Sequence, residues 1–329
     1  MPKFSIILPV RNGGSYVKEC VQSILSQSVE DFDLQVLDNS STDGTLEWIR
    51  SLTDVRITVY PAPRPMTIEE NWGRIVSIPK NEFMTMIGHD DLLHPSYLKE
   101  MNELIARHPD ASLYQSHYRY IDQDGHLIRY CLPMDEIQQA SEFLACQFSR
   151  TMESMGSGYL MRSSDYDKLG GMPGYYPNLI FADYELWINL MRLGYKATSA
   201  RECFSYRIHQ NLSRMTNGML YQGAFGKYMS FIKSLIDQDP VIKCIVERYG
   251  KDMLYYNCES LSHRLLKTPS RQRTISVNEF IKKCESYAND LIPEQQFKPL
   301  HKFRIRIAGQ LDRSAIGRIV FNLFIKTFR

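Results

Sequence analysis

Along residues 1–90, short apolar runs alternate with amphipathic segments and polar loops. The first apolar run, 4–10, reads as a buried strand that ends at the polar loop 11–14. Apolar residues then recur at helical spacing, namely Val17, Val21, Ile24 and Leu25. Further strands are expected at 34–37, 55–60 and 83–87. This alternation predicts an α/β fold in which helices cover both faces of a mostly parallel sheet.

The chain from residue 100 onward mixes strands with helices before it becomes helical throughout. The expected elements are strands at 113–120, 126–130 and 204–209 and a helix at 184–193. The polar stretch 122–125 between the first two strands is typical of a β-hairpin turn. From about Met219 the pattern is helical. We therefore expect a sheet domain at 1–215 and a helical region at 216–329.

Three polar loops follow predicted strands, at 11–14, 38–44 and 88–91. In parallel α/β sheets, ligands bind beyond the carboxyl ends of the strands, so these loops are candidate binding elements. The third loop contains His89, Asp90 and Asp91. Adjacent carboxylates repel each other, and a divalent cation that bridges to a diphosphate would relieve this repulsion, since magnesium and manganese favour oxygen ligands. The alternative is a solvated acidic loop, or a cap for a helix from Pro95 onward.

Composition narrows the functional classes. The 329 residues are 43% apolar and 23% charged, which is typical of a globular protein, and a net charge of +2 does not indicate a general nucleic-acid binder. The seven cysteines are scattered without a CxxC pair, which argues against a disulfide framework or zinc site and fits a reducing cytoplasm. The sequence shows neither a signal-peptide pattern nor an apolar run of roughly 18 residues. We expect a cytoplasmic protein, with the inner face of the cell membrane as a further location.

Several short motifs follow one another between residues 2 and 213. They are 5–13 (SIILPVRNG), 23–28 (SILSQS), 36–45 (VLDNSSTDGT), 71–73 (NWG), 88–91 (GHDD), 183–187 (DYELW) and 206–209 (YRIH). In order and spacing they resemble those of family 2 inverting glycosyltransferases with a GT-A fold. The resemblance implies transfer of a sugar from a nucleotide diphosphate sugar to an acceptor hydroxyl, with Mn²⁺ or Mg²⁺ as cofactor. Cell-surface polysaccharide or lipopolysaccharide synthesis is the implied setting, with a glycan or lipid-linked acceptor.

The resemblance also implies roles for single residues. Asp90 matches the last carboxylate of the DXD motif that ligates the metal, and Asp91 and His209 are further candidate metal ligands. Asp183 matches the general base. The candidate donor-binding residues are Pro9, Val10, Arg11, Asn12, Asp38, Asn39, Asn71, His89 and Arg207.

Structural roles compete with several of these assignments. Asp183 precedes an amphipathic helix and would also serve as its N-cap, although partial burial against apolar neighbours would raise its pKa and make it a better base. The imidazole of His209 would equally well hydrogen-bond to neighbouring residues of its strand and bind no metal. Arg207 could contact a phosphate or form a structural ion pair. Trp72 and Trp187 read as packing residues.

Three positions depart from the family pattern. Gly88 stands where the first DXD aspartate is common, and Ala182 replaces a glutamate before the general base. Asn39 replaces an acid that would accept a proton from a uracil or thymine ring, so the base preference stays open. These losses leave a catalytically silent nucleotide-sugar-binding or scaffolding subunit as the alternative. A sugar nucleotidyltransferase is disfavoured, because the loop 11–14 is not rich in glycine and lysine.

The C-terminal part carries a basic amphipathic pattern. Its apolar stripe consists of Ile316, Ile319, Val320, Leu323 and Phe324, and its polar face of Arg318, Asn322, Lys326 and Arg329. Basic residues precede it, namely Lys302, Arg304, Arg306 and Arg313. Such a helix can lie on an anionic membrane surface, which we therefore consider as a partner, and the alternative is packing on the protein itself. No nucleic-acid partner is expected.

Overall fold

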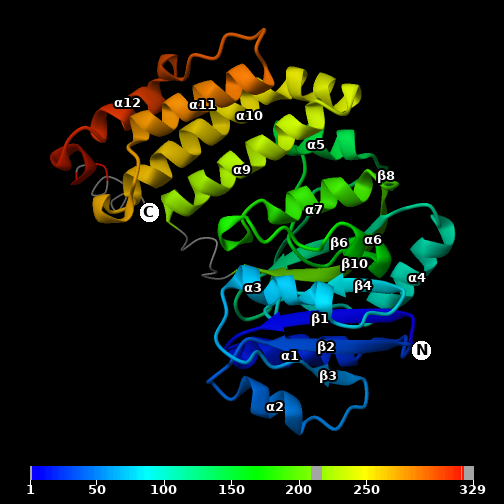
Figure 1. The fold of residues 1–329 in the computed structure, drawn as a ribbon. Helices are drawn as coiled ribbons and strands as arrows, with labels where there is room; N and C mark the ends of the chain where they lie inside the picture. Colours follow the sequence, from blue (N-terminus) through cyan, green and yellow to red (C-terminus); the bar gives the residue numbers. More distant parts are fainter. Residues whose placement is uncertain (1, 209–216, 320, 322–329) are drawn as a thin grey trace. The chain divides into compact units, whose positions relative to one another are not determined.

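The computed structural model describes residues 2–208, 217–319 and 321. The chain divides into two compact units, which are drawn in Figure 1. The first unit consists of Met1–Phe143, Met152–Tyr175 and Ala182–Asn211. The second consists of Leu144–Thr151, Tyr176–Phe181 and Leu212–Arg329. Two short segments that precede residue 182 therefore belong to the C-terminal unit.

A single large sheet forms the centre of the first unit. Its strands follow the order β3-β2-β1-β4-β9-β6-β10-β5, while β7 pairs with β6 and β8 with β10. The strands are β1 (Phe4–Val10), β2 (Phe32–Asp38), β3 (Ile57–Val59), β4 (Phe83–Met86), β5 (Leu92–Leu93), β6 (Leu113–Ile121), β7 (Leu127–Tyr130), β8 (Ile137–Gln138), β9 (Leu160–Arg162) and β10 (Lys196–Arg207). Every residue of β1 is buried, as expected for a strand covered on both faces.

The sheet is mixed, and its longest pairings are parallel. The four strands from β3 to β4 are parallel, as the sequence predicted. Beyond them, β9 lies antiparallel to both β4 and β6, and β6 pairs in parallel with β10. The α/β fold class is thus confirmed, and the parallel arrangement stops where β9 is inserted.

The helices predicted after residues 14, 44 and 67 and near 184 are all present, together with further short helices that the sequence did not predict. The helices of the first unit are α1 (Gly14–Leu25), α2 (Thr45–Ser51), α3 (Ile68–Gly73), η1 (Arg74–Ser77), α4 (Tyr97–Arg107), α6 (Ser163–Lys168) and α7 (Ala182–Met191). Helix α5 (Ala140–Ser149) is divided between the two units, and η2 (Pro177–Leu179) belongs to the second. The predicted capping box opens α3, because the Glu70 N–H donates to Thr67 Oγ1 and the Thr67 N–H donates to the Glu70 carboxylate.

Several predicted boundaries shift. The strand expected at 55–60 is shorter, since Val55 is 98% exposed and lies in the turn before β3. The expected hairpin is present as β6 and β7. The helix expected at 184–193 begins earlier, so Asp183 lies in the first turn of α7 and not at its N-cap. The last expected strand is the end of the longer β10.

The second unit is helical. Its main helices are α9 (Gly218–Ile236), α10 (Pro240–Lys267), α11 (Val277–Leu291) and α12 (Phe303–Leu311), with η3 (Ser270–Gln272) and η4 (Pro299–His301) between them. Both α9 and α11 pack against α10, and α12 packs against α10 and α11 (Figure 1). None of the helices in the described part of the chain is long and apolar enough to cross a membrane.

Candidate functional site

The loop after β4 makes a tight turn around Asp90. The Asp91 N–H donates to the Gly88 carbonyl at 3.2 Å. A Cβ atom added to Gly88 would lie 2.8 Å from Asp90 Oδ1 and 3.2 Å from Asp91 Oδ2. Any side chain at residue 88 would therefore displace the Asp90 carboxylate. This contact gives a physical reason why glycine replaces the first acid of the resembled motif.

Asp91 is buried and bonded within the protein. Its Oδ1 accepts the Arg207 backbone N–H at 3.0 Å, and its Oδ2 accepts the Ser157 hydroxyl at 2.8 Å. Burial, together with the neighbouring charge of Asp90, raises the pKa of Asp91 well above its usual value. Both oxygens of this predicted metal ligand thus hold the loop in place, while the Asp90 side chain is half-buried. Sequence reasoning missed Ser157, which carries no motif.

Arg207 is fully buried and connects the Asp90 loop to two other segments. Its Nε donates to the Asp90 carbonyl at 2.8 Å, and its Nη1 donates to the Gln123 carbonyl at 3.0 Å. Its Nη2 pairs with Glu19 Oε2 of α1 at 2.6 Å, and the guanidinium lies over the Tyr16 ring at 4.7 Å. Of the two roles considered for Arg207, the structure therefore contains the ion pair.

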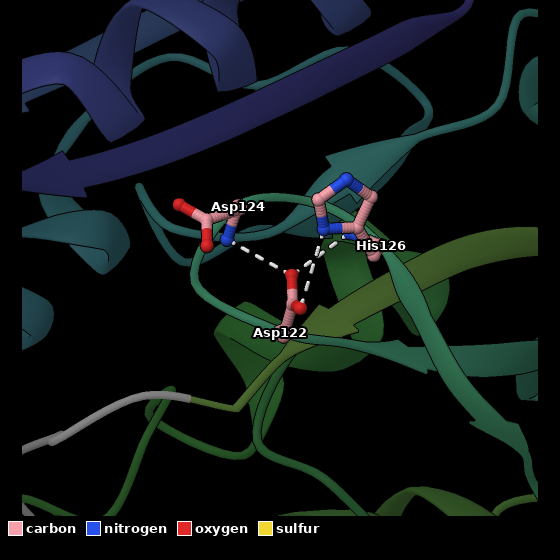
Figure 2. Close-up of side chains that lie close together, drawn as sticks. All are labelled: Asp122, Asp124 and His126. Carbon is pink, nitrogen blue, oxygen red and sulfur yellow. Dashed lines mark hydrogen bonds and ion pairs between the residues drawn. The ribbon is translucent and has the colours of Figure 1, made fainter.

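Figure 2 shows the side chains of the hairpin turn between β6 and β7. Asp122, Asp124 and His126 have potential ligand atoms within 4.8 Å of one another. Asp122 Oδ1 accepts the backbone N–H groups of Asp124 at 2.9 Å and His126 at 2.8 Å (Figure 2). Both hydrogen bonds lower the pKa of Asp122, and the bond from the His126 N–H has the larger effect. The cluster is thus explained as the hydrogen bonding of an exposed turn.

Asp183 is half-buried in the first turn of α7, where burial raises its pKa to about 6. The backbone N–H groups of Asp183 and Tyr184 oppose this shift, as expected at a helix N-terminus. A Cβ atom on Gly156 would lie 3.8 Å from Asp183 Oδ2, so glycine leaves one side of the carboxylate uncrowded. The carboxylate therefore changes charge close to neutral pH.

Aromatic packing supports the start of α7. Trp187 is fully buried, its ring centroid lies 4.4 Å from that of Tyr159, and its Nε1 donates to the Met155 carbonyl at 3.1 Å. Glu185, the neighbouring acid of the motif, is buried and accepts a hydrogen bond from the Tyr175 hydroxyl. Trp187 thus has the packing role predicted for it.

The Tyr206 hydroxyl is affected by the carboxylates of both the Asp90 loop and α7. Burial raises the pKa of Tyr206, and the negative charges of Asp91, Asp90 and Asp183 raise it further. The three acids therefore act on one hydroxyl at the end of β10, although 92 residues (183 − 91) separate Asp91 from Asp183 in the sequence. The electrostatic influence of these predicted residues therefore meets at the end of β10. His209 lies outside the described residues.

The loops after β1 and β2 are bonded to each other. The Thr42 N–H donates to Asn12 Oδ1 at 2.8 Å, and the Asn12 N–H donates to Ser41 Oγ at 2.9 Å. Asp38 is fully buried; its Oδ2 accepts the Ser41 N–H at 3.2 Å, and its Oδ1 has no hydrogen-bond partner within the described part of the chain. The predicted donor-binding residues divide by exposure into exposed Arg11 and Asn12, half-buried His89, and buried Pro9, Val10, Asp38, Asn39, Asn71 and Arg207.

Comparison with known proteins identifies the family. The model of Glycosyl transferase family 2 matches residues 5–170. The chain belongs to this family of glycosyltransferases. TuaG of Bacillus subtilis, a glycosyltransferase assigned to teichuronic acid biosynthesis, is 26% identical over 64% of this chain and 81% of its own.

Two solved structures resemble this fold. TarS 1-349 of S. aureus, in complex with UDP-GlcNAc, has a TM-score of 0.65 at 12% identity, over 94% of this chain and 91% of the other. The mannosyltransferase PcManGT of Pyrobaculum calidifontis, in complex with GDP-Man and Mn²⁺, has a TM-score of 0.54 at 14% identity, over 99% and 88%. The predicted GT-A-like fold is confirmed by these structures.

Proposed function

We propose that this glycosyltransferase moves a sugar from a nucleoside diphosphate sugar to an acceptor hydroxyl with inversion. The observation that carries the proposal is the family match over residues 5–170, which the structure accompanies with the Asp90 carboxylate after β4 and the half-buried Asp183 in the first turn of α7. The nucleotide-sugar complexes of TarS and PcManGT support the donor class. In this proposal, 1–215 is the nucleotide-sugar-binding and catalytic domain, and 216–329 is a helical region.

The residues around Asp90 suit a divalent cation. Its half-buried carboxylate is a hard oxygen ligand, the absent side chain at Gly88 leaves room for that carboxylate, and PcManGT was solved with Mn²⁺. Asp90 would hold Mn²⁺ or Mg²⁺ while Asp91 fixes the loop, and His89 and His209 stay the further candidate residues for this site. What such an ion supplies, when bound, is Lewis-acid stabilisation of the charge on the departing diphosphate.

Asp183 is the proposed general base. Its carboxylate takes the proton of the acceptor hydroxyl as that oxygen bonds to the anomeric carbon. The bond from this carbon to the diphosphate breaks in the same step, and the electron pair leaves with the nucleoside diphosphate. A pKa of about 6 keeps the carboxylate mostly ionised at pH 7 while making it a stronger base than an ordinary aspartate.

The donor's nucleoside would lie at the ends of β1 and β2. Arg11 and Asn12 are the exposed residues there, and the loop of Asn12 is fixed by its bonds to Ser41 and Thr42. Pro9, Val10, Asp38 and Asn71 would form the buried floor of this site. In this proposal the exposed loop side chains contact the nucleotide directly, and the buried residues determine the shape of the site.

The acceptor is proposed to be a glycan or lipid-linked sugar of the cell envelope, since TuaG is assigned to teichuronic acid biosynthesis. In this proposal the acceptor lies at the cytoplasmic face of a membrane. Helix α12 supports a location there: Phe303 is 64% exposed, and Lys302, Arg304 and Arg306 beside it are exposed. Anionic lipid would attract these cations while the phenyl ring enters the interface.

The decisive experiment screens a panel of nucleotide sugars for release of nucleoside diphosphate, with manganese and with excess chelator. We expect one donor class to react only with the metal. Asp90→Ala should abolish both turnover and metal-dependent binding of the nucleoside diphosphate. Full activity of the wild type in excess chelator would contradict the metal site, and binding of nucleotide sugars without turnover of any acceptor would favour the silent subunit.

A further inference from the structure

Asn39 forms two hydrogen bonds with one backbone residue. Its Nδ2 donates to the Met66 carbonyl at 2.9 Å, and the Met66 N–H donates to its Oδ1 at 2.7 Å. A side-chain amide carries a donor and an acceptor, and so it matches the N–H and C=O of a peptide backbone. A carboxylate has no donor for the carbonyl. Asn39 is also only 4% exposed. The amide is therefore engaged at both ends and turned away from solvent.

The segment held in this way is the proline-containing loop 61–66, which returns from β3 toward α3. Its first half is tied to the same strand end, because the Ala62 N–H donates to the Asp38 carbonyl at 2.7 Å and the Ser40 hydroxyl donates to the Ala62 carbonyl at 3.3 Å. Met66 directly precedes Thr67, the N-cap of α3. Asn39 thus fixes the point at which the chain enters this helix.

Helix α3 and the residue after it complete a closed set of hydrogen bonds. The Asn71 Nδ2 group donates to the Leu37 carbonyl at 3.4 Å. Arg74 Nη1 donates to Asn71 Oδ1 at 2.9 Å and to the Asp38 carbonyl at 3.2 Å. The start and the end of α3 are therefore both bonded to the end of β2. In the described part of the chain, Asn39 is the only residue whose side chain binds both backbone groups of Met66.

We propose that Asn39 is a positioning residue that fastens the loop 61–66 beside the donor site and does not read the nucleotide base. This inference rests on the proposed function, because it treats the end of β2 as part of the donor site. Replacement of the usual acid by asparagine then reflects a different task for this position. An aspartate would keep the bond from the Met66 N–H but place a carboxylate against the Met66 carbonyl. The loop would be released, and every nucleotide would lose the same wall of its site.

The test compares wild type with Asn39→Asp, and Asn102→Asp serves as the matched control. Asn102 is exposed, and its Oδ1 accepts a bond from Lys3 that a carboxylate would keep. Hydrogen–deuterium exchange without nucleotide reports the loop directly. We expect exchange of the amides between Met66 and Glu70 to accelerate about tenfold in Asn39→Asp and to stay unchanged in the control.

Calorimetry with UDP, dTDP, GDP and CDP then reports the role in binding. Asn39→Asp should weaken all four by a similar factor, about tenfold, and keep their order of affinity. A change confined to UDP and dTDP would show that residue 39 reads the base and would overturn the proposal, as would unchanged exchange or unchanged affinities. If the wild type bound none of the four, the proposed function would fail, while the exchange result would still report whether Asn39 holds the loop.

Discussion

The Nε of Arg207 donates to the backbone carbonyl of Asp90 at 2.8 Å, while the Arg207 N–H donates to Asp91 at 3.0 Å. One buried residue thus binds two successive residues of the acidic loop. The same guanidinium pairs with Glu19, and so α1 also supports the loop. We infer that Arg207 orients Asp90 through its backbone, without contact with the donor.

Arg207→Lys should weaken metal-dependent binding of the nucleoside diphosphate about tenfold. Lysine keeps the charge but has one nitrogen, so it cannot replace bonds made by three. Arg207→Met should also lower the free energy of unfolding by about 3 kcal/mol, because buried carbonyl groups lose their donor. Calorimetry with and without manganese, together with denaturant unfolding, measures both effects.

The control for this prediction is Arg50→Lys, a change of the same type at an exposed position of α2. It should leave both quantities unchanged. If Arg207→Lys bound the nucleoside diphosphate as tightly as wild type, Asp90 would not depend on this arginine for its position.

Gly88→Ala should weaken manganese binding by about tenfold or more. The new methyl group would lie 2.8 Å from Asp90 Oδ1, closer than a carbon–oxygen contact allows, and the carboxylate would have to rotate away. Gly223→Ala is the matched control, because its nearest neighbour would be 4.0 Å away. Manganese titration followed by electron paramagnetic resonance tests the pair. Equal affinity in the two variants would show that the carboxylate tolerates the methyl group.

The sequence was sufficient for features that depend on local pattern. The buried strand β1 and the capping box of Thr67 and Glu70 depend only on residues close together in the sequence, and the structure contains both. Strand β9 has only three residues, Leu160–Arg162, and therefore no period to detect. Its insertion between β4 and β6 makes the sheet mixed, which the apolar pattern could not predict.

Partners of polar side chains were harder to predict, because they come from distant segments. The sequence placed Asn39 in a base pocket, but its amide binds Met66, 27 residues away. Arg207 was considered for a phosphate, yet its nitrogens bind protein groups as far away as Glu19. Val55 was predicted to begin a strand because it is apolar and β-branched, but it lies in a turn and is exposed.

The membrane location predicts that Phe303→Ser and Arg306→Ser each reduce binding to vesicles that contain anionic lipid by about threefold or more. Phe303 lies on the face of α12 opposite its buried residues Ile305, Ala308 and Gly309, and Arg306 is exposed beside that face. Truncation before α12 is a poorer test, since it would also expose the apolar surface that these residues cover. Vesicle co-sedimentation at low and high salt measures the effect, which salt should reduce.

Val241→Ser is the control for the apolar contact, because Val241 is 60% exposed at the start of α10, without the basic neighbours of Phe303. Its vesicle binding should equal that of the wild type. If the wild-type protein ignored anionic vesicles at low salt, α12 would have no role in membrane binding.

Asp183→Asn should lose about two to four orders of magnitude in turnover and retain donor affinity, because the amide cannot accept the acceptor's proton. Below pH 6 the wild-type rate should fall as the carboxylate becomes protonated. Glu185→Gln is the neighbouring comparison; its side chain points about 200° away on the helix and bonds to Tyr175. A near-wild-type rate in Asp183→Asn, with an inactive Glu185→Gln, would assign the base to Glu185.

The same pKa predicts how Asp183 affects stability. The folded value of about 6 lies above the unfolded value near 3.9, so between these pH values the folded state holds its proton more tightly. The contribution of this group to stability is therefore complete below pH 4 and is lost as pH rises to about 6. Asp183→Asn avoids that loss. It should be more stable than wild type at pH 8 by about 2 kcal/mol, after allowance for partial exposure, and nearly equal at pH 4. Denaturant unfolding at both pH values tests this difference, and an equal advantage at both would mean that Asp183 does not titrate in this range.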